Sequence, residues 1–306
     1  PKLGDKVFLW PTYDFAAPIE DSLDGVTHAF RTKEYELRNE LYRQILTILD
    51  LRIPEVIEFS RLEFEGLPVS KRKLKPLIEE KLVEGWADPR LPTLMGLKRR
   101  GFTPDAIRRF VLSLGITLSE TKPSIEVLEA FNRKIIDSKS KRLLFIDEPF
   151  KLTIKNANRK KVLFKNHPSI EMGSREIDVN NVVFISSKDA EKLKNGMEIR
   201  LIELYNIKVS TIDMAKKEGL VEYTDDILKE NIQKIQWVSE LDMVKYTILK
   251  PNKLFIGDKL NPNSLEVLEG FAESYVNTLS NGTMVQFIRF GFCRIEDTKS
   301  AILTHK

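Results

Sequence analysis

Residues 67–80 read LPVSKRKLKPLIEE, and they lie where the sequence changes from mixed polar and apolar segments to plain helix. Four basic residues stand between positions 71 and 75, directly after Pro68 and Ser70. Such a run is a solvated turn before a helix, or it is a loop that holds a polyphosphate. A charge run alone favours the solvated turn. The rest of the chain therefore has to decide between the two interpretations.

Bulk composition predicts a globular chain without membrane or metal partners. The 306 residues, 42% hydrophobic and 31% charged, are enough for about two domains. No apolar run is long enough to cross a bilayer. The single cysteine, Cys293, excludes an internal disulfide, fits a reducing cytoplasm and is expected to be buried. The three histidines and the cysteine show no zinc-type spacing, so no bound metal is expected.

The positive charge is concentrated in short clusters. Net charge is only +4, but basic residues gather at 71–75, 98–100, 108–109, 139–142 and 159–161. Scattered basic clusters suit a long polyanion such as a nucleic acid better than a single phosphate. Ordinary surface lysine explains them about equally well at this point.

The first 66 residues alternate between strand and helix patterns. We expect a buried strand at KVFLW (6–10), a turn-rich segment at 12–30 and a strand within EVIEFSRLEF (55–64). Residues 33–51 have the spacing of an amphipathic helix, whose expected buried stripe is Leu37, Leu41, Ile45 and Ile48. This alternation predicts an α/β domain with a parallel sheet.

The remaining sequence divides into a helical part and an all-β part. Residues 76–146 are expected to be helical, with Thr103 as the N-cap of a helix that begins at Pro104. The expected buried face of this helix is Ile107, Phe110, Val111 and Leu114. From residue 147 onward, short β-type runs alternate with Asn-Gly turns such as KNGM and SNGT. This region is expected to form one or two β-barrels.

Several stretches resemble one family when they are taken in order. WPTYDFAAPIEDSLDGVTHAFRTKE, EFSRLEFEGLPVSKRKL, VEGWADPRLPTLMGLKRRGFTPDAIRRF, NHPSIEMGSREI and VQFIRFGFCRI are similar to the class I glutaminyl- and glutamyl-tRNA synthetases. The resemblance is to the archaeal and eukaryotic type of glutamyl enzyme. It implies the second half of a Rossmann-type catalytic domain at 1–66, a loop and helical region that contacts the tRNA stem at 67–146, and a β-barrel anticodon-binding region at 147–306.

The resemblance also decides the opening stretch. VSKRK resembles the second signature of class I synthetases, written KMSKS: Val69, Ser70, Lys71 and Arg72 match its last four positions, and Pro68 replaces the first lysine. The implied chemistry is the attack of a carboxylate on the α-phosphate of ATP. A mobile loop that delivers an ammonium group stabilises the charge that builds on the phosphates.

Within this resemblance, Lys71 is the expected catalytic cation, and Ser70 holds the loop against phosphate or ribose. Lys73 is the second choice for contacting ATP. In the family, the backbone around an Arg-Leu pair lies beside adenine, which assigns Arg61 and Leu62 to the ATP site together with Val69. The implied cofactor is ATP with Mg²⁺ as the substrate complex.

Three further residues match the family's amino-acid pocket: Tyr13, Arg31 and Val56. An arginine at position 31 can pair with a side-chain carboxylate in bidentate fashion, whereas a neutral amide offers no such charge. The resemblance therefore implies glutamate as the substrate. A glutaminyl-tRNA synthetase remains the alternative within the enzyme class.

The first signature of the family, HIGH, does not occur in this sequence. The resemblance implies a C-terminal portion of the enzyme, with the N-terminal half of the same enzyme as a partner. We expect this portion to bind tRNA(Glu) but not to catalyse alone, with disorder around 67–75. Whether tRNA(Gln) is also a substrate is left open, as is a non-catalytic tRNA-binding module. Arg175 in EMGSREI is the candidate base-reading residue, and an ordinary surface arginine in a loop is the alternative.

Overall fold

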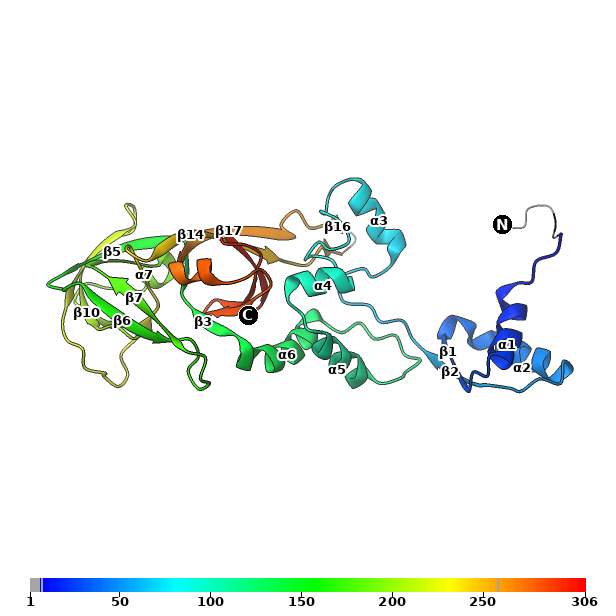
Figure 1. Cartoon of the computed structure of the whole chain (residues 1–306). Coiled ribbons are helices and arrows are strands. Elements are labelled where there is room, and N and C mark those ends of the chain that lie inside the picture. Colours follow the sequence, from blue (N-terminus) through cyan, green and yellow to red (C-terminus); the bar gives the residue numbers. More distant parts are fainter. Residues whose placement is uncertain (1–5, 7, 258) are drawn as a thin grey trace. The chain divides into compact units, whose positions relative to one another are not determined.

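A computed structural model describes residue 6 and residues 8–257 and 259–306 (Figure 1). The chain divides into two compact units. The first contains residues up to 65 together with 110–124, and the second contains 66–109 and 125–306. In the described part of the chain, no helix is both long and apolar enough to span a membrane.

The first unit is a small α/β arrangement. It contains α1 (Tyr13–Leu23), β1 (His28–Thr32), the 3-10 helix η2 (Lys33–Arg38), α2 (Asn39–Ile48) and β2 (Glu55–Phe59). Strands β1 and β2 pair in parallel, with Arg31 opposite Glu58. Parallel neighbours need a crossover, and η2 with α2 supplies it. The predicted parallel sheet is therefore confirmed.

Three local predictions in this unit are wrong. The segment expected to be turn-rich contains α1, with Pro18 buried inside the helix. Within KVFLW, Val7 lies outside the described residues, and Phe8 and Leu9 are in no strand and are 94% and 87% exposed. Apolar composition does not make a strand unless a neighbouring strand offers hydrogen bonds.

The buried stripe of the 33–51 helix is also wrong. Leu37 and Ile48 are 96% and 82% exposed, whereas Tyr42 and Leu46 are buried. Leu37 lies in η2, and the inward face of α2 contains Tyr42, whose hydroxyl donates to Asp21 on α1 at 3.0 Å.

The helices of the second unit are α3 (Lys71–Glu79), α4 (Leu94–Arg100), the first half of α5 (Pro104–Leu114) and α6 (Ile125–Ile136), followed by the 3-10 helix η3 (Asp137–Lys139). The predicted cap is confirmed, because Thr103 Oγ1 accepts a hydrogen bond from the backbone N–H of Ala106 at 3.2 Å. Val111 is 46% exposed, so its assignment to the buried face of α5 is wrong.

Two seven-stranded sheets, each curled like a barrel, dominate the described part of this unit. The first sheet has the order β12-β9-β10-β11-β5-β8-β13, and the second has the order β3-β18-β19-β20-β14-β17-β4. The chain therefore forms β3 and β4 of the second sheet first, then the strands of the first sheet, and then the remaining strands of the second sheet. The first core surrounds Trp237 and Phe150, and the second surrounds Tyr246 and Phe287.

The strands of the first sheet are β5 (Pro149–Lys155), β8 (Val182–Ser186), β9 (Glu198–Leu201), β10 (Asn206–Asp213), β11 (Glu218–Tyr223), β12 (Lys234–Ile235) and β13 (Val238–Ser239). Those of the second sheet are β3 (Lys141–Leu143), β4 (Phe145–Asp147), β14 (Met243–Pro251), β17 (Leu265–Glu273), β18 (Met284–Phe287), β19 (Gly291–Ile295) and β20 (Ser300–His305). The other elements are the β6–β7 hairpin (Lys160–Lys165, Ser174–Val179), the β15–β16 hairpin (Phe255–Ile256, Lys259–Leu260), α7 (Ser187–Ala190) and the 3-10 helix η4 (Ser274–Thr278). The prediction that residues 76–146 are all helical is wrong from Lys141 onward, because β3 and β4 complete the second sheet.

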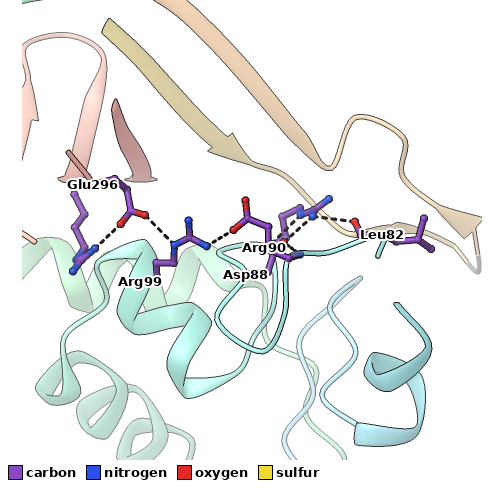
Figure 2. A network of polar contacts seen from close by, with 7 residues as sticks. Leu82, Asp88, Arg90, Arg99 and Glu296 are labelled. Atoms are coloured by element: carbon purple, nitrogen blue, oxygen red, sulfur yellow. Dashed lines mark hydrogen bonds and ion pairs between the residues drawn. The ribbon is translucent and has the colours of Figure 1, made fainter. Parts of the chain in front are cut away.

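A polar network connects the helical part of this unit with the second sheet (Figure 2). Arg99 on α4 pairs with Glu84 at 2.5 Å and with Glu296, just after β19, at 2.9 Å. Arg90 pairs with the buried Asp88 at 2.7 Å and donates to the carbonyl oxygen of Leu82 at 3.0 Å. The network ties the segment that follows α3 to the end of a barrel strand.

Candidate functional sites

Arg31 on β1 is a buried guanidinium held in one orientation. Its side chain is 8% exposed, and Nη2 donates to Asp21 Oδ2 at 2.7 Å. Tyr42 donates its hydroxyl to the same oxygen at 3.0 Å. The guanidinium carbon lies 4.5 Å from the centre of the Tyr42 ring and 5.4 Å from that of Tyr13. Burial, helped by Asp21, raises the pKa of Tyr42 to about 12, so the hydroxyl stays a donor.

This arrangement leaves part of the guanidinium available. Among the described residues, the buried Nε of Arg31 has no hydrogen-bond partner. Val56 on β2 is opposite Ala29, two residues before Arg31, so its side chain lies on the same face of the sheet as that of Arg31. The structure therefore brings Tyr13, Arg31 and Val56 to one face of the first unit.

Asp21 and Tyr42 were not predicted as parts of this site. A buried arginine needs a carboxylate partner, so placing Arg31 in a pocket already implies that a carboxylate lies nearby. It does not say which carboxylate, because Asp21 reaches Arg31 from another element.

Arg61 and Leu62 follow β2 in the first unit. Arg61 pairs with Glu34 at 2.9 Å and lines a cavity of about 120 Å³ together with Lys33, Glu63 and Thr121. Leu62 forms a parallel bridge with Thr121. Charged groups wall the cavity, and some of them already pair with one another. An incoming phosphate or ribose would therefore replace Glu34 as the partner of Arg61.

The basic run belongs to the second unit and is helical. Helix α3 begins at Lys71, with Ser70 at the N-cap position and Val69 partly buried before it. Leu74 and Leu77 are buried, and this spacing of three residues turns one face inward, which explains why the expected loop is a helix. The prediction of disorder at 67–75 is therefore wrong for 71–75, which are helical.

The side chains at the start of α3 point to solvent. Lys71, Arg72 and Lys73 are exposed, whereas Lys75 pairs with Glu79 at 3.2 Å. The N-terminus of a helix carries partial positive charge and free backbone N–H groups. Together with two lysines, this end of α3 is suited to an anionic ligand.

A second cavity, of about 420 Å³, opens between the two barrel-like sheets. Its lining includes Lys188, Lys192 and Gln236 from the first barrel, and Lys250, Arg289, Phe290 and Lys306 from the second. Arg289 crosses from one barrel to the other, donating to both carboxylate oxygens of Asp189 at 2.9 and 3.1 Å.

Four carboxylates also line the cavity, and three of them pair with its cations: Asp147 with Lys188, Asp189 with Arg289 and Glu266 with Lys250. A single-stranded nucleic acid entering here would exchange these carboxylates for its phosphates and could stack a base on the aromatic ring. Sequence reasoning did not find this set, because its members are spread over 160 residues.

The family description "tRNA synthetases class I (E and Q), catalytic domain" matches residues 1–138. The corresponding anticodon-binding domains match residues 140–227 and 234–296. The chain belongs to the class I (E and Q) tRNA synthetases. The resemblance seen in the sequence is thereby confirmed, as is the order of a catalytic part followed by anticodon-binding barrels.

Curated relatives of this synthetase chain include archaeal and eukaryotic proteins. It is 47% identical over 305 residues to a glutamate–tRNA ligase of Cenarchaeum symbiosum, covering 100% of this chain and 54% of the relative. The Nitrosopumilus maritimus glutamate–tRNA ligase is 46% identical, covering 99% and 53%. A probable cytoplasmic glutamate–tRNA ligase of Dictyostelium discoideum is 32% identical, covering 98% and 42%. The chain thus spans about half the length of these two archaeal relatives.

In this synthetase the surface position predicted for Arg175 is wrong. Its side chain is 4% exposed and lies on β7, where it pairs with Glu273. The turn-like sequence EMGSREI suggested a loop, but the arginine is the second residue of a strand and points inward. In this structure Glu273 holds the Arg175 guanidinium, and the assignment of Arg175 as a base reader stays a prediction.

Proposed function

We propose that this chain is part of a glutamate–tRNA ligase, which activates glutamate with ATP and transfers it to tRNA. The observation that carries the proposal is the buried guanidinium of Arg31, oriented by Asp21 between two tyrosine rings. The remaining N–H groups of Arg31 can pair with the side-chain carboxylate of glutamate. A glutamine amide carries no negative charge for these N–H groups, which disfavours the glutaminyl alternative. The relatives named glutamate–tRNA ligase support the same choice.

In this proposal Lys71 supplies the charge for activation. The glutamate α-carboxylate attacks the α-phosphate, and pyrophosphate leaves with its electron pair. Lys71 and the N-terminus of α3 stabilise the negative charge on the phosphates, with Ser70, Lys73 and Val69 beside them. Arg61 and Leu62 lie against the nucleotide. Mg²⁺ enters with ATP, and no group of three or more potential ligand side chains gathers among the described residues.

The inter-barrel cavity is the proposed site for the anticodon of tRNA(Glu). Bases splayed from a loop can stack on Phe290 and find cations on both walls. The N-terminal half of the same enzyme is the proposed partner of the first unit. The cytoplasm is the proposed location, in keeping with the reduced and fully buried Cys293.

The proposal is tested by amino-acid discrimination in the full-length enzyme. Arg31→Cys should raise the KM for glutamate in ATP–pyrophosphate exchange by at least about 100-fold, because a buried charge-assisted pair is lost. The slow ATP–pyrophosphate exchange with glutamine should change little. Arg43→Cys, at an exposed position on α2, is the matched control and should behave as wild type. An unchanged ratio of glutamate to glutamine in Arg31→Cys would remove Arg31 from the pocket.

A further inference from the structure

The end of α3 is fixed more firmly than its start. Its buried side chains, Leu74 and Leu77, come after the first three residues of the helix, whereas Lys71 and the two residues that follow it are exposed. At the end, the backbone N–H of Leu82 donates to the carbonyl oxygen of Leu77 at 2.9 Å. At the start, Ser70 makes no side-chain capping bond among the described residues. Lys71 therefore stands at the less restrained end of the helix.

Three polar contacts hold the segment that directly follows α3 (Figure 2). Arg90 Nη2 donates to the carbonyl oxygen of Leu82 at 3.0 Å. The buried Asp88 accepts a hydrogen bond from the backbone N–H of Glu84 at 2.9 Å. Arg99 on α4 pairs with the carboxylate of Glu84 at 2.5 Å. Two backbone groups and one side chain of this short segment are therefore fixed.

The same two arginines reach the second sheet. Arg90 Nη1 donates to Ser264 Oγ, just before β17, at 3.2 Å. Arg99 Nε donates to Glu296 Oε2, just after β19, at 2.9 Å. The partners in these contacts are 174 and 197 residues apart in the sequence. Arg90 and Arg99 together thus form an anchor that joins the end of α3 to two strand ends of a folded barrel.

The anchor also holds a strained turn. Lys81, between α3 and Leu82, has a φ of 57°, in the left-handed region that lysine rarely adopts. Such a conformation persists where the surrounding structure over-determines it. The contacts of Arg90 and Arg99 with the residues after Lys81 provide that restraint. When they are removed, the turn relaxes and the direction in which α3 leaves it changes.

We propose that Arg90 and Arg99 are positioning residues for Lys71: they anchor the end of α3 to the second barrel, and the anchored end determines where the start of the helix presents its ammonium group. This inference rests on the role given to Lys71 in the proposed function. In this role the two arginines contact neither ATP nor glutamate. Loosening the anchor displaces a contact to the transition state and leaves ground-state binding in place, so kcat falls and KM does not.

The test is ATP–pyrophosphate exchange by the full-length enzyme, with saturating tRNA(Glu) present throughout so that differences in tRNA affinity do not enter. The decisive variant is Arg99→Met. It releases Glu84 but leaves Glu296 paired with Arg294 at 2.7 Å, so the barrel keeps an ion pair at this place. It should lower kcat by at least about tenfold, because a small displacement of a catalytic group is costly. KM for ATP and for glutamate should stay within about twofold. Lys98→Met, at an exposed position of the same helix, is the control and should behave as wild type.

A double-mutant cycle with Lys71→Ala separates positioning from a general structural role. If the anchor acts through Lys71, Arg99→Met should have almost no further effect on kcat once Lys71 is replaced. Equal losses of kcat in the two backgrounds would overturn the inference, as would wild-type kcat in Arg99→Met. Wild-type exchange by Lys71→Ala would instead refute the proposed role of Lys71 itself, and the inference with it.

Ser264→Ala tests the other contact between the anchor and the barrel. It removes the hydrogen bond to Arg90 Nη1, while Arg90 keeps its ion pair with Asp88 and its bond to Leu82. This variant should lower kcat in the same direction and with the same dependence on Lys71, so it replaces Arg99→Met if that one does not fold. Wild-type kcat in a folded Ser264→Ala enzyme would exclude Arg90 from the proposed anchor.

Discussion

Lys71 stands at the first position of α3, where its ammonium group adds to the free N–H groups of the helix start. In the full-length enzyme, Lys71→Ala should slow ATP–pyrophosphate exchange by at least ~100-fold, because one charge contact to the transition state is lost. The KM for glutamate should hardly change. Lys75→Ala is the control, since Lys75 is engaged with Glu79. Exchange at the wild-type rate in Lys71→Ala would contradict the assignment.

His305 is a second residue whose behaviour follows from burial. It is 2% exposed and packs against the rings of Phe102 and Phe292, with Nε2 3.4 Å from Asn132 Nδ2. Burial, with the neighbouring charge of Arg133, lowers its pKa from 6.5 to about 4. Between these values the unfolded chain binds a proton that the folded chain does not. The free energy of unfolding should therefore fall as pH drops through this window, by at most about 3 kcal/mol from this group.

The measurement is urea unfolding of the chain at pH 7.5 and pH 4.5, with His305→Gln for comparison. The variant stays neutral in both states, so its loss of stability on acidification should be smaller than that of wild type. Parallel losses in the two proteins would show that His305 does not contribute.

The sequence predicted part of the amino-acid site, and the missing part has a physical explanation. Resemblance selected Tyr13 and Arg31, and the structure places the guanidinium 5.4 Å from the tyrosine ring. Asp21 was missed because it reaches Arg31 from α1, a contact that no periodicity encodes. Arg175 was misplaced because its partner, Glu273, is 98 residues away in the sequence. A turn-like composition says nothing about so distant a carboxylate.

At the scale of elements, the type of a segment (helix or strand) was predicted better than which of its faces is buried. Most strands after residue 147 were expected from their β-branched runs, and α2 was expected from its spacing. The face of α2 failed because Tyr42 turns inward, where its hydroxyl donates to Asp21 of another element, a contact that apolar spacing does not encode. The KVFLW segment failed because strand formation depends on a neighbour that composition does not reveal.

The loop before α4 gives a prediction at this scale (Figure 2). Asp88 is fully buried as a side chain and accepts from Arg90 Nε and from two backbone N–H groups, each at 2.9 Å. Burial would raise its pKa, but these hydrogen bonds outweigh burial and hold the pKa below its usual value. Arg90→Met should therefore destabilise the second unit by about 3–5 kcal/mol, because a buried carboxylate loses its partner.

Chemical denaturation of the chain measures this loss. Lys216→Met is the control, since it breaks an exposed pair with Asp213 and should change stability by less than about 1 kcal/mol. Similar midpoints for Arg90→Met and Lys216→Met would mean that Asp88 finds water or another cation when Arg90 is removed.

At the scale of the whole molecule, the two units differ in how well they cover their apolar side chains. Each barrel of the second unit has its own core of fully buried side chains, including Trp237 in one and Phe287 in the other. In the first unit, Phe30 on β1 is 58% exposed and Phe59 on β2 is 37% exposed. We expect the second unit to be the more resistant to proteolysis.

The last prediction concerns catalysis by the 306-residue chain. In open parallel sheets a nucleotide binds outside the carboxyl ends of the strands, at the point where the strand order reverses. The parallel sheet among the described residues has two strands, β1 and β2, so it offers no such reversal. The purified chain should therefore show no measurable glutamate activation in ATP–pyrophosphate exchange, while it binds tRNA(Glu) with an affinity that falls steeply with salt. Full-length enzyme assayed beside it is the positive control. Robust exchange by the chain would contradict the requirement for further parallel strands, and the roles given to Arg61 and Lys71 would have to be rederived.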